Sequence, residues 1–358
     1  IYKRNCTYYI LCAEGGTGYG HCVTMGRSKD IWGPYESDPV NPILTATAFD
    51  FNERGIDEFL KPHMYNKDSI LQKSGHGSLI ETQLGEMYMV HHCSRPFTSE
   101  LRCTLGRESA IQKMEWTADG WLRLAGGGKL AKEYVQASTL PEHKFASEND
   151  AIFFTEGDVL QGWYTPRISH ESFAILTERK GFLRLRGQET LCSLNKASLL
   201  ARKLTSVKTQ VTTKMEFQPL IYKHYAGLAL YYDNMNYIML RKYWSDSLTG
   251  SALAIMRIEN GKKTEFTDTR IALQNDKAIW LRLAINQKEV RFYWSHDGKT
   301  YGQIGGIYDT SEFSDEYCKY GEFTGSFAGL FCVDSMTHER YADFEFFDVI
   351  SDNMVNPQ

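Results

Sequence analysis

Short apolar runs, separated by clusters of Gly, Asn and Asp, follow one another along almost the whole chain. The runs are rich in Tyr, Ile, Val, Leu and Trp, which is typical of β-strands joined by turns. The clearest predicted strands are residues 8–13, 86–91, 181–185, 226–231, 237–240, 253–258, 280–286 and 290–295. Convincing long amphipathic helices are absent, and residues 195–203 fit a helix or a buried strand equally well. The sequence therefore predicts an all-β protein.

A glycine-rich and then polar stretch near the middle of the chain separates two kinds of strand spacing. Before it, Trp and Gly recur in hairpin-like units, as in the blades of a β-propeller. After it, strands return at a spacing of about 8–12 residues, which is typical of a β-sandwich. We therefore predict part of a propeller over residues 1–140, a linker over 141–157 and a β-sandwich over 158–358.

Composition and charge exclude two classes of partner. The 358 residues contain 40 Lys and Arg against 44 Asp and Glu, a net charge of −4. A broad nucleic-acid or anionic membrane surface needs clustered basic residues, so we expect neither partner. No apolar run approaches the roughly 18 residues of a membrane-spanning helix. Aromatic residues make up 13% of the chain, and exposed aromatic rings are surfaces on which sugar rings stack.

The eight cysteines show neither a CxxC pair nor the spacing of a zinc site. Several lie inside apolar runs, which favours buried free thiols over a disulfide framework and indicates a cytoplasmic protein. Ile1 is not an initiator Met, and a strand is already in progress there. We therefore expect that a segment precedes Ile1 in the natural protein.

Three polar side chains stand out as candidates for chemistry. Glu14 follows an apolar strand and precedes two glycines, so its carboxyl group is rigidly held where a ligand can approach. His76 lies between glycines in SGHG, where the backbone must approach another group closely. Arg107 precedes a predicted strand, and its guanidinium could donate a forked pair of hydrogen bonds to sugar hydroxyls or to a carboxylate. Each has a structural alternative: a strand-end turn for Glu14, an ordinary hydrogen-bonded histidine for His76, and a salt bridge with Glu108 or another neighbour for Arg107.

An ordered series of motifs resembles the β-xylosidase branch of glycoside hydrolase family 43 over nearly the whole chain. In the first half these are AEGGTGYGH (13–21), SKDIWGPYE (28–36), NPIL (41–44), QKSGHGSLIET (72–82), MYMVHHCSRP (87–96), LGRESAIQKMEW (105–116) and DGWL (119–122). In the second half they are TPRIS (165–169), GFLRLRGQETL (181–191), AGLALYYDNMNY (226–237) and FTGSFAGLFCVD (323–334).

The resemblance implies the later blades of a five-bladed propeller followed by a concanavalin-like β-sandwich, and hydrolysis of a glycosidic bond with inversion. It places Glu14 on the family's general acid, Arg107 on a sugar-binding arginine, and His76 on the histidine under the active centre. Phe323 matches the segment whose aromatic ring the sandwich lends to the rim of the pocket, with Phe327 as the alternative.

The sequence departs from the family's pattern in its carboxylates. An inverting glycosidase needs a general base as well as an acid, and in the family the base Asp and a second Asp that tunes the acid lie upstream of the AEGG motif. No Asp of this chain matches either motif. We therefore expect an upstream segment or a separate chain to complete the propeller, and the 358 residues alone to be inactive. Gly20 stands where relatives often carry a Glu, which leaves the substrate preference open.

Two hypotheses of function follow. The first is an exo-1,4-β-xylosidase that acts on xylo-oligosaccharides, with α-L-arabinofuranosidase activity as well and no cofactor needed for catalysis. The second is a carbohydrate-binding protein without catalysis. By resemblance, the sandwich also suggests a structural calcium ion with Asp343 as a ligand, the alternative being an Asp at the end of an edge strand. The sequence leaves the oligomeric state open, a homo-oligomer included.

Overall fold

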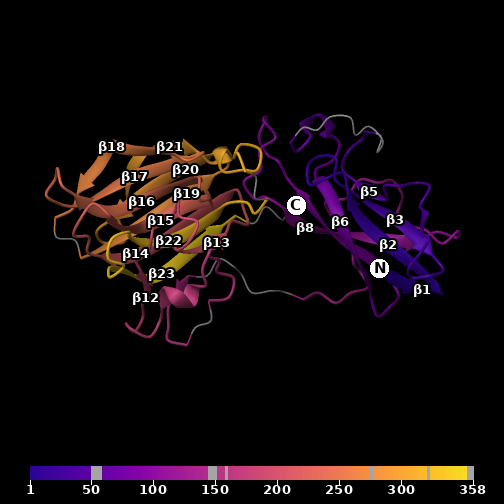
Figure 1. Ribbon diagram of the computed structural model, residues 1–358, viewed down its shortest axis with the longest axis horizontal. Coiled ribbons are helices and arrows are strands. Elements are labelled where there is room, and N and C mark those ends of the chain that lie inside the picture. The colour runs from indigo at the N-terminus through magenta and orange to yellow at the C-terminus, as the bar shows by residue number, and fades with distance from the viewer. Residues whose placement is uncertain (50–58, 144–150, 158–159, 275–276, 321–322, 353–358) are drawn as a thin grey trace. The chain divides into compact units, whose positions relative to one another are not determined.

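The computed structural model describes residues 1–49, 59–143, 151–157, 160–274, 277–320 and 323–352 (Figure 1). Contacts divide the chain into two compact units: Ile1–Cys103 with Arg107–Lys144, and Thr104–Gly106 with Phe145–Gln358. The predicted linker, 141–157, includes residues outside the described part, so its bounds stay a prediction. Within the described residues, the regular elements are strands apart from three short 3-10 helices (Pro62–Met64, His170–Ser172 and Thr310–Glu312), which confirms the all-β prediction. No helix there is long and apolar enough to cross a membrane.

The first unit contains two antiparallel sheets, each like a blade of a propeller. One has the order β1-β2-β3-β4 with β5 also paired to β3, and the other has the order β6-β7-β8-β9. Val23, Met25, Met89 and Leu122 are at most 2% exposed and belong to one apolar cluster that joins the two sheets. The strands are β1 (Tyr2–Arg4), β2 (Thr7–Glu14), β3 (Cys22–Ser28), β4 (Glu36–Ser37), β5 (Leu44–Thr45), β6 (Gln72–Glu81), β7 (Met87–Ser94), β8 (Glu108–Trp116) and β9 (Leu122–Leu124).

The second unit is a sandwich of two antiparallel sheets, which Figure 1 shows as stacked layers. One sheet has the order β11-β12-β23-β14-β19-β20-β21 with β10 also paired to β23, and the other has the order β13-β22-β15-β16-β17-β18. The strands are β10 (Ile152–Phe153), β11 (Ala174–Ile175), β12 (Leu183–Arg186), β13 (Ser198–Lys203), β14 (Lys208–Phe217), β15 (His224–Asp233), β16 (Asn236–Ser245), β17 (Gly250–Glu259), β18 (Lys262–Ala272), β19 (Ala278–Asn286), β20 (Glu289–Ser295), β21 (Gly302–Asp309), β22 (Phe327–Asp334) and β23 (Tyr341–Ser351).

Residues 195–203, for which the sequence fitted a helix and a strand equally well, contain a strand in the structure. Ser198–Lys203 forms β13 at the edge of its sheet, paired with β22. Leu199 and Leu200 are adjacent and both almost completely buried, so the two faces of this strand are covered. A strand buried on both faces has no alternation of apolar and polar residues, which is why its pattern imitates a helix.

All eight cysteines lie in the described part of the chain, and all are free thiols. Cys22, Cys93, Cys103, Cys318 and Cys332 are buried and the other three are exposed. Burial raises the pKa of the Cys93 thiol to about 12. The structure therefore fits the preferred interpretation of free thiols rather than a disulfide framework.

Candidate functional site

Glu14 is the last residue of β2, and its carboxylate is held from the neighbouring strand β3. The hydroxyl of Thr24 donates a hydrogen bond to Glu14 Oε1 at 2.9 Å. Gly15 and Gly16 follow with φ of 78° and 73°, a conformation that glycine adopts most readily. A Cβ on Gly15 would lie 1.8 Å from the carbonyl oxygen of Gly20, so the turn closes tightly on itself. The two glycines thus let the chain reverse beside the carboxylate.

His21 lies under this turn and supports it. Its Nδ1 is 3.0 Å from the carbonyl oxygen of Glu14, and the residue is only 2% exposed. A Cβ on Gly75 would lie 2.0 Å from His21 Cδ2, so the backbone of β6 can pass this ring only because residue 75 is glycine. The ring centroid of His92, on β7, is 4.5 Å from that of His21. A pair of imidazoles therefore lies next to the backbone of Glu14.

His76 and Arg107 join the same cluster. His76 is an exposed residue of β6, at an irregularity in the pairing with β7, and its φ is 54°. The ring centroids of His76 and His92 are 5.8 Å apart. Arg107 precedes β8 and donates from Nη2 to the carbonyl oxygen of Thr17, in the glycine loop after Glu14, at 2.6 Å. The structure thus brings together three residues that lie up to 93 positions apart in the sequence.

Thr24, His21 and His92 were not among the site residues predicted from the sequence. Both histidines nevertheless lie in family motifs, at the end of AEGGTGYGH and in the HH pair of MYMVHHCSRP. The signal that could have found His92 is strand alternation, since His91 and His92 must point to opposite faces of β7. Thr24 gives no such signal, because a threonine inside a strand is ordinary.

Burial keeps both inner histidines neutral near neutral pH. Burial is the main reason that the pKa of His21 is lowered to about 4. Hydrogen bonds to the backbone of Gly16 and Glu14 raise this pKa in part, and the charges of Arg107 and His76 lower it further. Burial also lowers the pKa of His92 to about 3, helped by the charges of His21, Arg107 and His76. The inner wall of the site is therefore uncharged imidazole, and Arg107 carries the permanent positive charge.

These two depressed pKa values predict a loss of stability in acid. The unfolded chain takes up a proton at His21 and His92 as the pH falls through about 6.5, whereas the folded chain stays neutral there down to about pH 4. One pKa unit corresponds to about 1.4 kcal/mol, so proton uptake by the unfolded chain lowers the free energy of unfolding between pH 6.5 and pH 4 by roughly 3 kcal/mol for each histidine, or about 6 kcal/mol for the pair. Urea unfolding of wild type and His92→Gln, followed across this range, measures the effect. Equal slopes against pH for the two proteins would contradict it.

The two candidate rim aromatics belong to the second unit. Phe323 is partly exposed and has a φ of 60°, and Phe327 is the first residue of β22. The ring of Phe327 packs edge-on against Tyr164, with 5.5 Å between the centroids. The place of Phe323 at the rim of the pocket stays a prediction.

Asp343 has partners that argue against the predicted calcium site. Arg184 donates to both of its carboxylate oxygens at 2.7 and 2.8 Å, and Arg179 donates to Oδ2 at 2.9 Å. A cation would have to displace two guanidinium groups that already neutralise the charge. The alternative, an Asp at the end of an edge strand, is wrong, because β23 lies between β12 and β14; the calcium ion itself stays a prediction. Among the described residues, no group of three or more His, Cys, Asp or Glu side chains could hold a metal ion.

Comparisons with known proteins show which family the chain resembles. Residues 152–350 match the β-xylosidase C-terminal concanavalin A-like domain, and residues 1–122 match the glycosyl hydrolases family 43. A xylan 1,3-β-xylosidase of Vibrio sp is 33% identical over 98% of this chain and 64% of its own length. Xylosidase/arabinosidase 43B of Humicola insolens is 32% identical over 97% of this chain and 62% of its own.

A solved structure, the xylan β-1,4-xylosidase of Bacillus halodurans C-125, superposes with a TM-score of 0.87 at 39% identity. The superposition covers 97% of this chain and 63% of that one. The chain thus spans a little under two thirds of the length of the relatives it matches. Since the matches extend over both units, the chain belongs to glycosyl hydrolase family 43, in the branch whose β-xylosidases carry a C-terminal concanavalin A-like domain.

Proposed function

We propose that this chain supplies the general acid and the sugar-binding wall of an inverting exo-1,4-β-xylosidase that also cleaves α-L-arabinofuranosides. The observation that carries the proposal is the position of Glu14. Its carboxylate is oriented by Thr24 and lies on a turn that bears Thr17, the partner of Arg107. The structural alternative is a glutamate that merely ends a strand. Such a residue would need neither the hydrogen bond from Thr24 nor Arg107 bound to the following turn.

Glu14 would protonate the glycosidic oxygen as the bond to the sugar breaks. In an inverting enzyme a second carboxylate, about 6.5–9.5 Å away, activates a water molecule on the opposite face of the sugar. We assign this base to no residue of the chain and propose that residues outside it provide the base. Arg107 and His76 would hold the sugar hydroxyls, and neutral His21 would keep the turn of Glu14 in place.

The named relatives support the substrate class. They include a xylan 1,3-β-xylosidase, a xylosidase/arabinosidase, a non-reducing end α-L-arabinofuranosidase of Bacteroides ovatus and the β-1,4-xylosidase structure. Terminal xylopyranose and arabinofuranose present similar hydroxyl faces to a small pocket. One site that accepts both sugars, at the non-reducing end of a chain, is therefore reasonable.

Hydrolysis of nitrophenyl β-D-xylopyranoside and nitrophenyl α-L-arabinofuranoside tests the proposal. We expect no turnover by the 358 residues alone, and turnover of both substrates once the upstream propeller residues of a family 43 relative are supplied, fused or in trans. Turnover of either substrate by the chain alone would place the base within it and refute the divided site. A reconstituted propeller that cleaves neither substrate would refute the glycosidase itself.

A further inference from the structure

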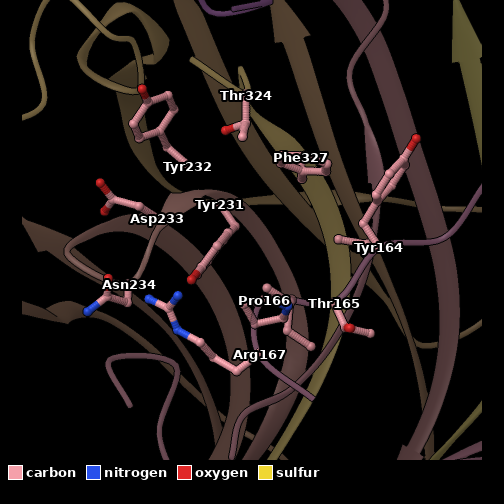
Figure 2. Close-up of a pocket in the computed structure, with 12 residues that line it drawn as sticks. Tyr164, Thr165, Pro166, Arg167, Tyr231, Tyr232, Asp233, Asn234, Thr324 and Phe327 are labelled. Atoms are coloured by element: carbon pink, nitrogen blue, oxygen red, sulfur yellow. The ribbon is translucent and has the colours of Figure 1, made fainter. Parts of the chain in front are cut away.

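A pocket of about 250 Å³ opens on the sandwich, and all its lining residues belong to the second unit (Figure 2). Three segments form most of it: residues 164–167, residues 231–234 at the end of β15, and Thr324 with Phe327 at the start of β22. Most of these residues lie in TPRIS, AGLALYYDNMNY and FTGSFAGLFCVD, motifs that the proposed active site does not use apart from its rim aromatic. None of Glu14, His76 and Arg107 lines the pocket.

An aromatic wall forms one side of the pocket. Tyr164 is 53% exposed, yet it is rigidly held: its N–H donates to Ala201 O at 2.8 Å, and Ala201 N–H donates back to Tyr164 O at 3.0 Å. The ring of Phe327 supports it edge-on. Tyr231 is 7% exposed and its ring stacks on that of Tyr237, with 5.7 Å between the centroids. A half-exposed ring fixed by its neighbours is a ready surface for a flat ligand face.

The other end of the pocket is polar. In Figure 2 the guanidinium of Arg167, the amide of Asn234 and the hydroxyl of Tyr231 gather there. Within the described part of the chain, no residue forms a hydrogen bond or salt bridge with the Arg167 side chain. The carboxylate of Asp233, on a residue 7% exposed, accepts hydrogen bonds from Met235 N–H at 2.7 Å and Asn236 Nδ2 at 2.9 Å. Donors and acceptors therefore converge opposite an apolar wall.

This combination selects the kind of ligand. Pockets that hold drug-sized molecules are about 300–1,000 Å³, so 250 Å³ suits a single sugar ring with its neighbours outside. Arg167 and Asp233 offset each other in charge, which disfavours a uronate or another anion. In Figure 2 the ring of Tyr164 points away from Arg167 and Asn234, so an uncharged sugar chain, with the C–H face of one ring on Tyr164 and the hydroxyls of the next ring at Arg167 and Asn234, matches both ends.

We propose that this pocket is a carbohydrate-binding site for a xylan-type oligosaccharide, in which the guanidinium of Arg167 contacts one xylosyl unit and the ring of Tyr164 stacks on the next. The choice of xylose rests on the proposed function, whereas the class of ligand, a neutral sugar, rests on the pocket. The site gives the sandwich a role in holding the polysaccharide.

Calorimetric titration of the full chain with xylotriose tests the site. We expect Tyr164→Ala and Arg167→Ala each to weaken binding at least tenfold, and Tyr164→Phe, which keeps the ring, to bind like wild type. Tyr222→Ala is the matched control, because Tyr222 is 60% exposed and lies outside the pocket. Arg107→Ala removes a sugar contact of the proposed active site, so xylotriose binding that persists in this variant belongs to the pocket of the sandwich. Thermal unfolding of each variant shows whether it remains folded.

Two results would overturn the proposal: no binding of xylotriose to the chain, or binding that is lost in Arg107→Ala but unchanged in Tyr164→Ala and Arg167→Ala. The failure of the proposed function is distinguishable from these. If the reconstituted propeller cleaves neither nitrophenyl glycoside while Tyr164 and Arg167 still determine binding, the glycosidase is refuted and the sugar site stands.

Discussion

Replacing Glu14 by Gln is expected to lower kcat for xylobiose by about 10²–10⁴-fold in the reconstituted propeller, because general acid catalysis contributes that much. The amide has the size and hydrogen-bonding shape of the acid but no proton to give to the leaving oxygen. A nitrophenolate leaves without protonation, so the loss for nitrophenyl β-D-xylopyranoside should be much smaller. The ratio of the two losses, measured by steady-state kinetics, identifies Glu14 as the acid rather than as a binding group.

The matched control for this prediction is Glu115→Gln. Glu115 is an exposed residue of β8 in the same unit, and we expect both activities to stay at the wild-type level. Thr24→Val removes the hydroxyl that donates to Glu14 and should give an intermediate loss for xylobiose. If Glu14→Gln lowers xylobiose hydrolysis by less than tenfold, or lowers both substrates equally, Glu14 is not the general acid.

The largest loss of stability is expected from Asp334→Ala, at the end of β22. Its carboxylate accepts bonds from the amides of Met336, Thr337, Glu339 and Arg340 and from the Thr337 hydroxyl, at 2.7 to 3.1 Å. Burial alone would raise the pKa of Asp334, but these hydrogen bonds outweigh it and hold the pKa well below its usual range. Alanine would leave the donors of the whole loop without a partner, at a cost of roughly 3 kcal/mol or more.

Urea unfolding measures this loss as a decrease in the free energy of unfolding. Asp334→Asn keeps one acceptor oxygen and should lose less than Asp334→Ala. Asp268→Ala is the control, because Asp268 is an exposed residue of β18, and we expect a change within about 0.5 kcal/mol. A loss of less than 1 kcal/mol for Asp334→Ala would contradict this prediction, because the loop between β22 and β23 would then be stable without the carboxylate of Asp334.

The sequence by itself determined the class of the fold and the identity of the candidate acid. Apolar runs bounded by turn residues are a local signal, so the predicted strands at residues 8–13 and 226–231 lie within β2 and β15. Glu14, His76 and Arg107 were found because each stands beside glycine in a short motif. Glycine is a strong local signal, since it marks places where the backbone turns or another group comes close.

Only the tertiary structure decided which side chains surround these residues. Thr24 and His21 reach Glu14 or its backbone, and His92 packs against His21, through packing between strands. Strand pairing thus brings together residues far apart in the sequence. For the same reason the sequence did not show that two arginines hold Asp343 in the interior of a sheet. Periodicity shows that a strand has an inner and an outer face, but the neighbours on each face depend on the order of strands in the sheet, which no local pattern encodes.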